Sequence, residues 1–429
     1  MQHKSIAFVF ILLFIISFTA SGQKQINSPY SRFNIGNLEP AASFKSLGMG
    51  GIGIGMKSNN SVYFANPASY SSIDTNSFIF DLGLDYTIVK LSDGTNNFTS
   101  EDMNFDHLLM GFPIAKGLGM AVGIVSASNG YYQLSQTVLK TDPDYDPIVG
   151  QYKSVHTGEG GFNKVFLGSG LKINKNFSVG INMLLLFGQV NRSYVVSFDD
   201  YTNVYGNNAT EKLEMHGINF NYGLHYTAYL KNDYFLNAGI SVSAGKSFSS
   251  DYQQLAYKYT VYNTRDTISY IADDSTKSFI PGTLGLGFTF GKINKFTAGF
   301  DYIMTKWSDA KIPGASGYTA DSRSYRFGLE YIPEKYSNYS LMKRLEYRAG
   351  AHIGDTYLMI NNEQVKEYGF SVGVGIPMRR TYSRTNFFFD YTRFTGAGSG
   401  AGTEHVEKYY TMGISLNLYD FWFIKRKYD

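Results

Sequence analysis

The chain has 429 residues, of which 16% are aromatic and 17% are charged, with 45 glycines, 10 prolines and no cysteine. The net charge of +3 is too small to indicate a nucleic-acid partner. The absence of cysteine excludes disulfides, iron–sulfur clusters, thiolate zinc sites and an acylated lipoprotein cysteine. Abundant glycine, tyrosine and phenylalanine favour a β-rich chain with many turns over a helical one.

Residues 1–22 have the pattern of a secretory signal peptide. Lys4 gives a basic start, residues 6–18 are almost all apolar, and Ala20, Ser21 and Gly22 are the small residues of a cleavage site. The apolar run is about 13 residues, whereas a membrane-spanning helix needs about 20. We therefore predict an exported protein whose mature chain begins near Gln23.

Residues 23–76 show neither helical nor strand periodicity. They contain a glycine run and a closing motif, formed by Gly48, Gly50, Gly51 and Gly53 and by Asn66, Pro67 and Ala68. The glycines match a dinucleotide-binding spacing formally, but no strand precedes them and no helix follows them. We interpret them as backbone that packs closely against another surface.

Residues 78–88 alternate with a period of two. Apolar and aromatic side chains fall on one face, and small or polar side chains fall on the other. One such strand fits a soluble sandwich as well as a membrane barrel. The pattern recurs over residues 179–187, 218–228, 284–290, 296–304, 368–376 and 410–418. Repeated segments of about ten residues with this alternation are typical of transmembrane β-barrels.

The pattern predicts about fourteen antiparallel strands with alternating connections. We expect strands near residues 77–90, 105–113, 118–137, 157–173, 177–197, 213–230, 234–258, 278–291, 295–308, 321–333, 344–360, 365–376, 386–395 and 408–418. Short turns alternate with long links such as 91–104 and 259–277, which is the arrangement of short periplasmic turns and long outer loops. Two links depart from it: 334–343 is long for a periplasmic turn, and 361–364 is short for an outer loop. An even strand number places both termini in the periplasm, with residues 420–429 as a periplasmic tail.

A barrel of about fourteen strands lies between filled small barrels and open porins. The inward-facing residues are mostly small, so they do not fill the lumen themselves. We predict that residues 23–76 form a plug inside a barrel of residues 77–419.

The glycine run followed by Val62-Tyr63-Phe64-Ala65 and Asn66-Pro67-Ala68 resembles the N-terminal pattern of the FadL/TodX (OmpP1) family of outer-membrane transporters. The opening of residues 28–33, SPYSRF, resembles a branch of these proteins typical of Bacteroidota. The resemblance implies a fourteen-stranded barrel that passes hydrophobic molecules, fatty-acid-like or aromatic, past a plug. It also implies a sideways exit where the third strand is kinked.

The predicted third strand has a candidate for this kink. Ser128, Asn129 and Gly130 interrupt an otherwise apolar strand, and Asn-Gly within a strand indicates a bulge or a break. The alternative is an ordinary turn, or a bulge that only adjusts curvature.

The other motifs in the sequence give weaker indications of a metal site or a catalytic site. Asp142, Asp144 and Asp146 alternate on a predicted loop, but Pro147 and Lys153 occupy the positions where a calcium-binding loop needs glycine and glutamate. None of the mature histidines has a metal-ligand spacing. No GxSxG motif is present, and His156 and Glu159 have no recognisable nucleophile. We predict no enzyme activity, no metal and no cofactor.

Two functions remain open from the sequence. The first is an outer-membrane channel for hydrophobic small molecules, surrounded by membrane lipid and controlled by the plug. The second is a non-transporting barrel subunit of an outer-membrane secretion or assembly complex.

Overall fold

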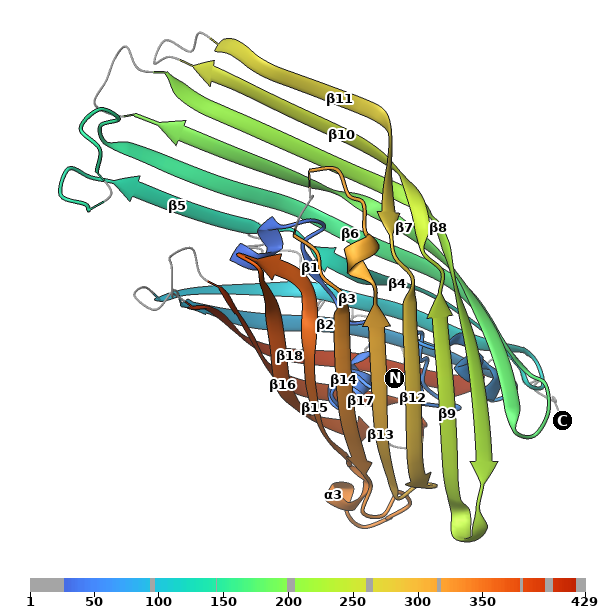
Figure 1. The fold of residues 1–429 in the computed structure, drawn as a ribbon. Coiled ribbons are helices and arrows are strands. Elements are labelled where there is room, and N and C mark those ends of the chain that lie inside the picture. Colours follow the sequence, from blue (N-terminus) through green and yellow to red (C-terminus); the bar gives the residue numbers. More distant parts are fainter. Residues whose placement is uncertain are drawn as a thin grey trace, which may run out of the picture.

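The computed structural model describes residues 27–92, 97–143, 145–198, 205–259, 265–314, 318–378, 381–397 and 404–421. The predicted signal peptide, residues 1–22, lies outside them. These residues form one antiparallel sheet that closes on itself, because β18 pairs with β2 along its length. Figure 1 shows the resulting barrel. No described helix is long and apolar enough to cross a membrane.

The strands of the wall follow one another in chain order. Their bounds are β2 (Ser77–Ser92), β3 (Asn97–Ala115), β4 (Leu118–Asn129), β5 (Tyr132–Val138), β6 (Tyr152–Lys172), β7 (Phe177–Ser197), β8 (Gly206–Tyr229), β9 (Tyr234–Ser243), β10 (Lys246–Tyr259), β11 (Arg265–Ile280), β12 (Thr283–Lys292), β13 (Phe296–Thr305), β14 (Ser322–Tyr331), β15 (Glu346–Ile360), β16 (Glu363–Pro377), β17 (Arg384–Ala397) and β18 (Glu404–Phe421).

Three positions in the wall are occupied by two strands in line. β4 and β5 both pair with β6, β9 and β10 both pair with β8, and β12 and β11 continue along β9 and β10. Counted in this way, the wall has 14 strands. The predicted strand number and the all-β barrel are therefore confirmed.

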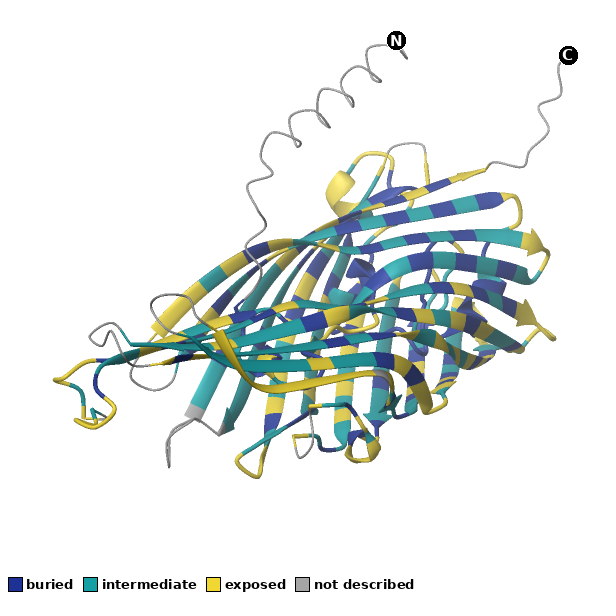
Figure 2. Cartoon of the chain, turned by 90° about the horizontal axis from the view of Figure 1, so that it is seen from above, coloured by how far each residue is buried: buried dark blue, intermediate teal, exposed yellow. Residues whose placement is uncertain are grey.

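The predicted alternation is also confirmed. On β18, Ile414, Leu416 and Leu418 lie exposed on the outer surface, while Ser415 and Asn417 are buried on the inner side. The same alternation appears as bands along the strands in Figure 2. A soluble sandwich would bury its apolar faces, so this surface is that of a barrel with an apolar exterior.

Two predicted loops are largely strand. Residues 97–104 belong to β3, and residues 265–277 belong to β11, although both stretches lack clear alternation. They are extended because a neighbouring strand supplies backbone partners, as β10 does for β11. The predicted short turn at 231–233 is present: Asn232 and Asp233 have φ of 59° and 64° between β8 and β9. Asn361 and Asn362, with φ of 50° and 64°, connect β15 directly to β16, where the alternation of loop lengths called for a long outer loop.

The N-terminal segment, residues 27–76, contains four short elements: η1 (Pro29–Arg32), β1 (Asn37–Leu38), α2 (Phe44–Leu47) and η2 (Pro67–Ser72). It contacts inward-facing residues of strands around the barrel, and Figure 1 shows it, in blue, enclosed by them.

At the C-terminal end of the chain, Asp420 and Phe421 are part of β18, and residues 422–429 of the predicted tail lie outside the described residues. α3 (Leu341–Arg344) precedes β15, and η3 (Lys231–Asp233) and η4 (Trp307–Asp309) lie in the connections that follow β8 and β13.

Candidate functional site

Asn66 joins the N-terminal segment to the wall. Its side-chain oxygen accepts a hydrogen bond from the Ala68 amide at 3.1 Å, which caps the first turn of η2. Its amide nitrogen donates to the carbonyl of Ile54 at 2.9 Å and, at 3.3 Å each, to those of Leu224 in β8 and Ile240 in β9. Asn66 is fully buried. An aspartate could accept the first bond but could donate none of the others.

η2 lies directly on the wall because the wall has glycines there. A Cβ added at Gly170 in β6 would lie 2.5 Å from the Pro67 carbonyl oxygen. A Cβ at Gly180 in β7 would lie 2.5 Å from the Ala68 amide nitrogen, and one at Gly223 in β8 would collide with Asn66 Oδ1 and lie 2.9 Å from the same nitrogen. The small inward-facing residues that the sequence showed are therefore the surface on which the Asn-Pro-Ala motif rests.

The predicted glycine run also packs against the inner face of the wall, on strands β14 to β16. Gly50 and Gly51 have φ of +68° and +81°, a conformation that other residues rarely adopt. The Gly50 amide donates to Ser371 Oγ at 2.8 Å, and a Cβ there would lie 2.5 Å from the Phe327 carbonyl oxygen. Gly48 and Gly53 have no positive φ, so they serve close packing rather than an unusual turn.

Asp301, on β13, is a residue of this site that the sequence did not single out. It is fully buried, and its Oδ2 accepts the amides of Gly53 at 2.6 Å and of Ile54 at 2.8 Å. From the other side, His225 Nε2 lies 2.6 Å from the Ile54 carbonyl oxygen. Both residues face inward by the alternation of their strands, and a buried carboxylate on an inner face was the available signal.

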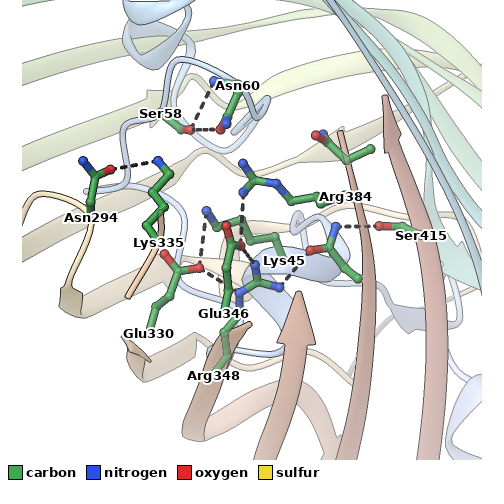
Figure 3. A network of polar contacts seen from close by, with 12 residues as sticks. Lys45, Ser58, Asn60, Asn294, Glu330, Lys335, Glu346, Arg348, Arg384 and Ser415 are labelled. Carbon is green, nitrogen blue, oxygen red and sulfur yellow. Dashed lines mark hydrogen bonds and ion pairs between the residues drawn. The ribbon is translucent and has the colours of Figure 1, made fainter. Parts of the chain in front are cut away.

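A buried ion network holds α2 against the wall (Figure 3). Lys45 Nζ lies 3.4 Å from Glu330 Oε2 in β14, and Arg348 Nε in β15 lies 2.8 Å from the same oxygen. Arg348 and Arg384 both pair with Glu346, Arg384 at 3.2 Å. All five side chains are less than 10% exposed. Three cations share two carboxylates here, so removing either carboxylate would leave uncompensated positive charge in buried surroundings, which is strongly destabilising.

The wall is incomplete between β3 and β5. β3 pairs with β4 only over residues 107–115, so residues 97–106 have a strand partner on the β2 side alone among the described residues. β6 is the one strand that pairs with β5 in the described part of the chain. Figure 1 shows the two strands diverging, with the start of the N-terminal segment between them.

The predicted kink residues lie at this place. β4 ends at Asn129, the chain passes through Gly130, and β5 starts at Tyr132. On the side of β4 that faces β3, Ser128 and Asn129 pair instead with β1, opposite Leu38 and Asn37. On their other side they pair with β6. The N-terminal segment thus continues the sheet where β3 leaves it.

Asn27 connects the two sides of this gap. Its backbone amide donates to Ser100 Oγ in β3 at 3.2 Å. Its side chain donates to the Gln133 carbonyl and accepts the Gln133 amide, both at 2.8 Å, and so imitates a strand partner for β5. The first residues of the segment therefore occupy the place of missing strand pairing.

Glu407 on β18 anchors the same residues. It is fully buried and accepts hydrogen bonds from Ser28 Oγ at 2.7 Å, the Tyr30 amide at 3.1 Å and the Tyr409 hydroxyl at 2.8 Å. The Tyr30 hydroxyl donates to the His405 carbonyl at 2.8 Å. The SPYSRF opening is thus held by a carboxylate that sequence patterns could not connect to it.

A cavity of about 890 Å³ lies between the N-terminal segment and the wall. It borders the gap, since its lining includes residues 104–106 of β3 and 126–129 of β4. Apolar lining residues include Leu184, Leu186, Phe248, Ile303, Trp307 and Phe394. Charged lining residues include Glu39, Asp85, Lys164, Arg326, Glu367 and Asp390. The cavity has room for a small molecule, with an apolar part and a charged part.

The described residues contain no group of three or more His, Asp or Glu arranged to hold a metal ion. Asp142 accepts the Leu139 amide and Asp146 accepts the Ile148 amide, so these two carboxylates stabilise turns of their own loop. Asp144 lies outside the described residues.

A family model described as BamG matches residues 2–429. No curated protein matches the chain. Among solved structures, a Pseudomonas aeruginosa FadL homologue is similar with a TM-score of 0.58 and 13% identity, over 90% of this chain and 99% of that one. The CymD monoaromatic hydrocarbon channel has a TM-score of 0.55 and 14% identity, over 90% and 99%. The Pseudomonas putida toluene transporter TodX has a TM-score of 0.53 and 12% identity, over 89% of this chain and 99% of that one. At these identities the likeness concerns the fold, which confirms that part of the predicted resemblance.

Proposed function

Because this chain belongs to the BamG family and has the fold of FadL-like channels, we propose that it spans the outer membrane and passes hydrophobic small molecules. The observation that carries the proposal is the gap between β3 and β5 beside the cavity. A molecule would enter from the outer side, occupy the apolar part of the cavity and leave sideways into the membrane. No covalent step is required. Membership of a Bacteroidota branch, and termini in the periplasm, stay predictions.

In this proposal residues 27–76 are a plug with two parts. The part from α2 to η2, with the glycine run and the Asn-Pro-Ala motif, is a fixed stopper, because the ion network and Asn66 hold it in buried surroundings. Residues 27–38 are the movable part. They contact β3 and β5 through a few hydrogen bonds of about 0.5–1.5 kcal/mol each, and β18 through two hydrogen bonds to Glu407 of about 1.5–3 kcal/mol each. Local opening follows the less stable contacts.

A reversible lock tests this proposal. Leu38 and Ser128 are directly opposite each other in β1 and β4, so Leu38→Cys with Ser128→Cys would form a disulfide across the pair. The natural chain has no cysteine to interfere. We expect the oxidised protein in liposomes to lose uptake of toluene and of a long-chain fatty acid, and reduction to restore it.

The matched control is Leu286→Cys with Tyr302→Cys, an opposite pair in β12 and β13 whose side chains lie on the outer face of the wall and do not line the cavity. This disulfide should leave uptake unchanged. Uptake at the unlocked rate in the oxidised Leu38–Ser128 variant would refute movement of residues 27–38 as the gate.

A second candidate function is favoured by the charged lining of the cavity, which suits a hydrophobic cargo poorly. In this alternative the chain is a sealed, non-transporting barrel subunit of an outer-membrane secretion or assembly complex. It predicts no uptake of either probe by the wild-type protein, and recovery of a complex of fixed stoichiometry after extraction in mild detergent. Uptake by the wild-type protein, abolished only by the lock, would exclude it.

A further inference from the structure

β11 is the last strand of a sheet that continues beyond the closed wall. β5, β6, β7, β8 and β10 extend with it, and β11 pairs with β10 from Arg265 to Ile280. The next strand in the wall, β13, ends opposite Thr283. Beyond that point, the one described partner on the free side of β11 is Lys311, which exchanges backbone hydrogen bonds with Phe279 at 2.7 and 3.0 Å. Residues 265–278 thus form an open edge, the uppermost strand in Figure 1.

This edge lies in water rather than in lipid. β12 has ten residues, enough to cross a hydrocarbon core by itself, since a tilted spanning strand needs about 9–11. Residues 265–273 lie beyond it and are all exposed, so neither face of this part of β11 is covered. Ile268, Tyr270 and Ile271 are 61%, 64% and 48% exposed. Large apolar side chains on both faces of a solvated edge strand are unusual, because such an edge invites strand pairing.

Charges flank the edge but are missing from its centre. Asp266 pairs with Lys258 of β10 at 3.2 Å, and the Arg265 guanidinium lies 5.1 Å from the ring centre of Tyr257. At the other end, hydrogen bonds from Thr276 and Ser275 hold the pKa of Asp273 below its usual value. The intervening residues 267–272, TISYIA, carry no charge. Native edges usually place a lysine or another charge in this position to prevent pairing.

A second copy of the chain fits this edge poorly. Two copies inserted in one membrane have the same orientation, so their β11 strands run parallel. An in-register parallel ladder would place Arg265 opposite Arg265 and Asp273 opposite Asp273, and like charges directly opposite are destabilising. An antiparallel ladder between copies would require one barrel to be inverted.

We propose that residues 267–272 of β11 bind an extended segment of a different polypeptide, which adds one strand to the outer sheet. The backbone of the edge would supply the hydrogen bonds, and Ile268, Tyr270 and Ile271 would supply apolar contacts on both faces. The partner segment is therefore uncharged over about six residues and apolar on both faces. This surface is independent of the passage of small molecules through the barrel.

Site-specific photo-crosslinking in the full-length protein in its own cells tests the proposal. A photoreactive residue is placed in turn at Ile268, Ser269, Tyr270 and Ile271, and the crosslinked partner residue is identified by mass spectrometry. We expect one partner segment, with the crosslinked partner residue moving by one position for each step along β11. The control position is Gln253 of β10, which is exposed but has strand partners on both sides, Lys212 and Ala272. A photoreactive residue at Gln253 should give no crosslink to this partner segment.

A charge at the centre of the edge provides the second variant. Ser269→Lys should lower the crosslinking yield from Tyr270 by about tenfold, the effect of about 1.4 kcal/mol, while Gln253→Lys should not. Heat resistance of the folded barrel on gels should be the same in both variants. Crosslinks to scattered partner residues, crosslinks to a second copy of this chain, or an unchanged yield in Ser269→Lys would each overturn the proposal.

Discussion

Glu407→Ala should release the first residues of the N-terminal segment from the wall. The carboxylate accepts two hydrogen bonds from this segment, from Ser28 Oγ and from the Tyr30 amide. Bonds to a charged acceptor contribute about 1.5–3 kcal/mol each, so the low end gives about 3 kcal/mol for the pair. Local opening should therefore become about a hundredfold more frequent, because 1.4 kcal/mol corresponds to a factor of ten.

The rate at which a buried cysteine reacts reports this opening. Ile35 is 5% exposed within an apolar cluster, and Ile35→Cys places a single thiol in an otherwise cysteine-free chain. Labelling by a membrane-impermeant maleimide should be about a hundredfold faster with Glu407→Ala than without it. Glu407→Gln, which retains one acceptor oxygen, should give an intermediate rate.

Glu367→Ala is the matched control for this measurement. Glu367 is a carboxylate that lines the cavity, but it lies on β16 and has no hydrogen bond to the N-terminal segment among the described contacts. It should leave the labelling rate within a factor of about two, below 0.5 kcal/mol. If Glu407→Ala and Glu367→Ala label equally fast, Glu407 is not the anchor of the segment.

Two further substitutions test the fixed part of the segment. Arg348→Met should remove the charged hydrogen bonds that Glu330 and Glu346 accept from Arg348 in buried surroundings. It should lower the free energy of unfolding by about 3–6 kcal/mol, measured by urea titration of the refolded barrel. An unchanged midpoint would show that the network is not a stabilising clamp. Gly180→Ala should displace η2, because its Cβ would lie 2.5 Å from the Ala68 amide, at a cost of about 1–3 kcal/mol. Gly117→Ala, at a hairpin turn away from η2, should instead leave the contacts of η2 intact, as hydrogen exchange of the Ala68 amide would show.

Much of the wall followed from the sequence because a strand with one apolar face repeats every two residues. The predicted strand 177–197 coincides with β7, whereas the predicted strands 118–137 and 234–258 are each divided in two, as β4 with β5 and β9 with β10. Several of the other strands differ at their outer ends. Those ends, such as residues 265–277, have no apolar face toward lipid and therefore no alternation to detect. Their extended conformation depends on the neighbouring strand, which local sequence does not reveal.

A closed barrel, an apolar exterior, a small-residue interior and an N-terminal segment of another kind could all be predicted from the amino-acid sequence. Local periodicity and composition are sufficient for these features, because each depends on whether a face meets lipid, water or packed backbone. The residues that hold that segment became apparent only in the folded chain. Ser28 and Glu407 are 379 positions apart, and Asn27 reaches Gln133 across a gap that exists because β3 and β5 diverge. Such contacts depend on the closure and register of the whole sheet, and no local pattern encodes them.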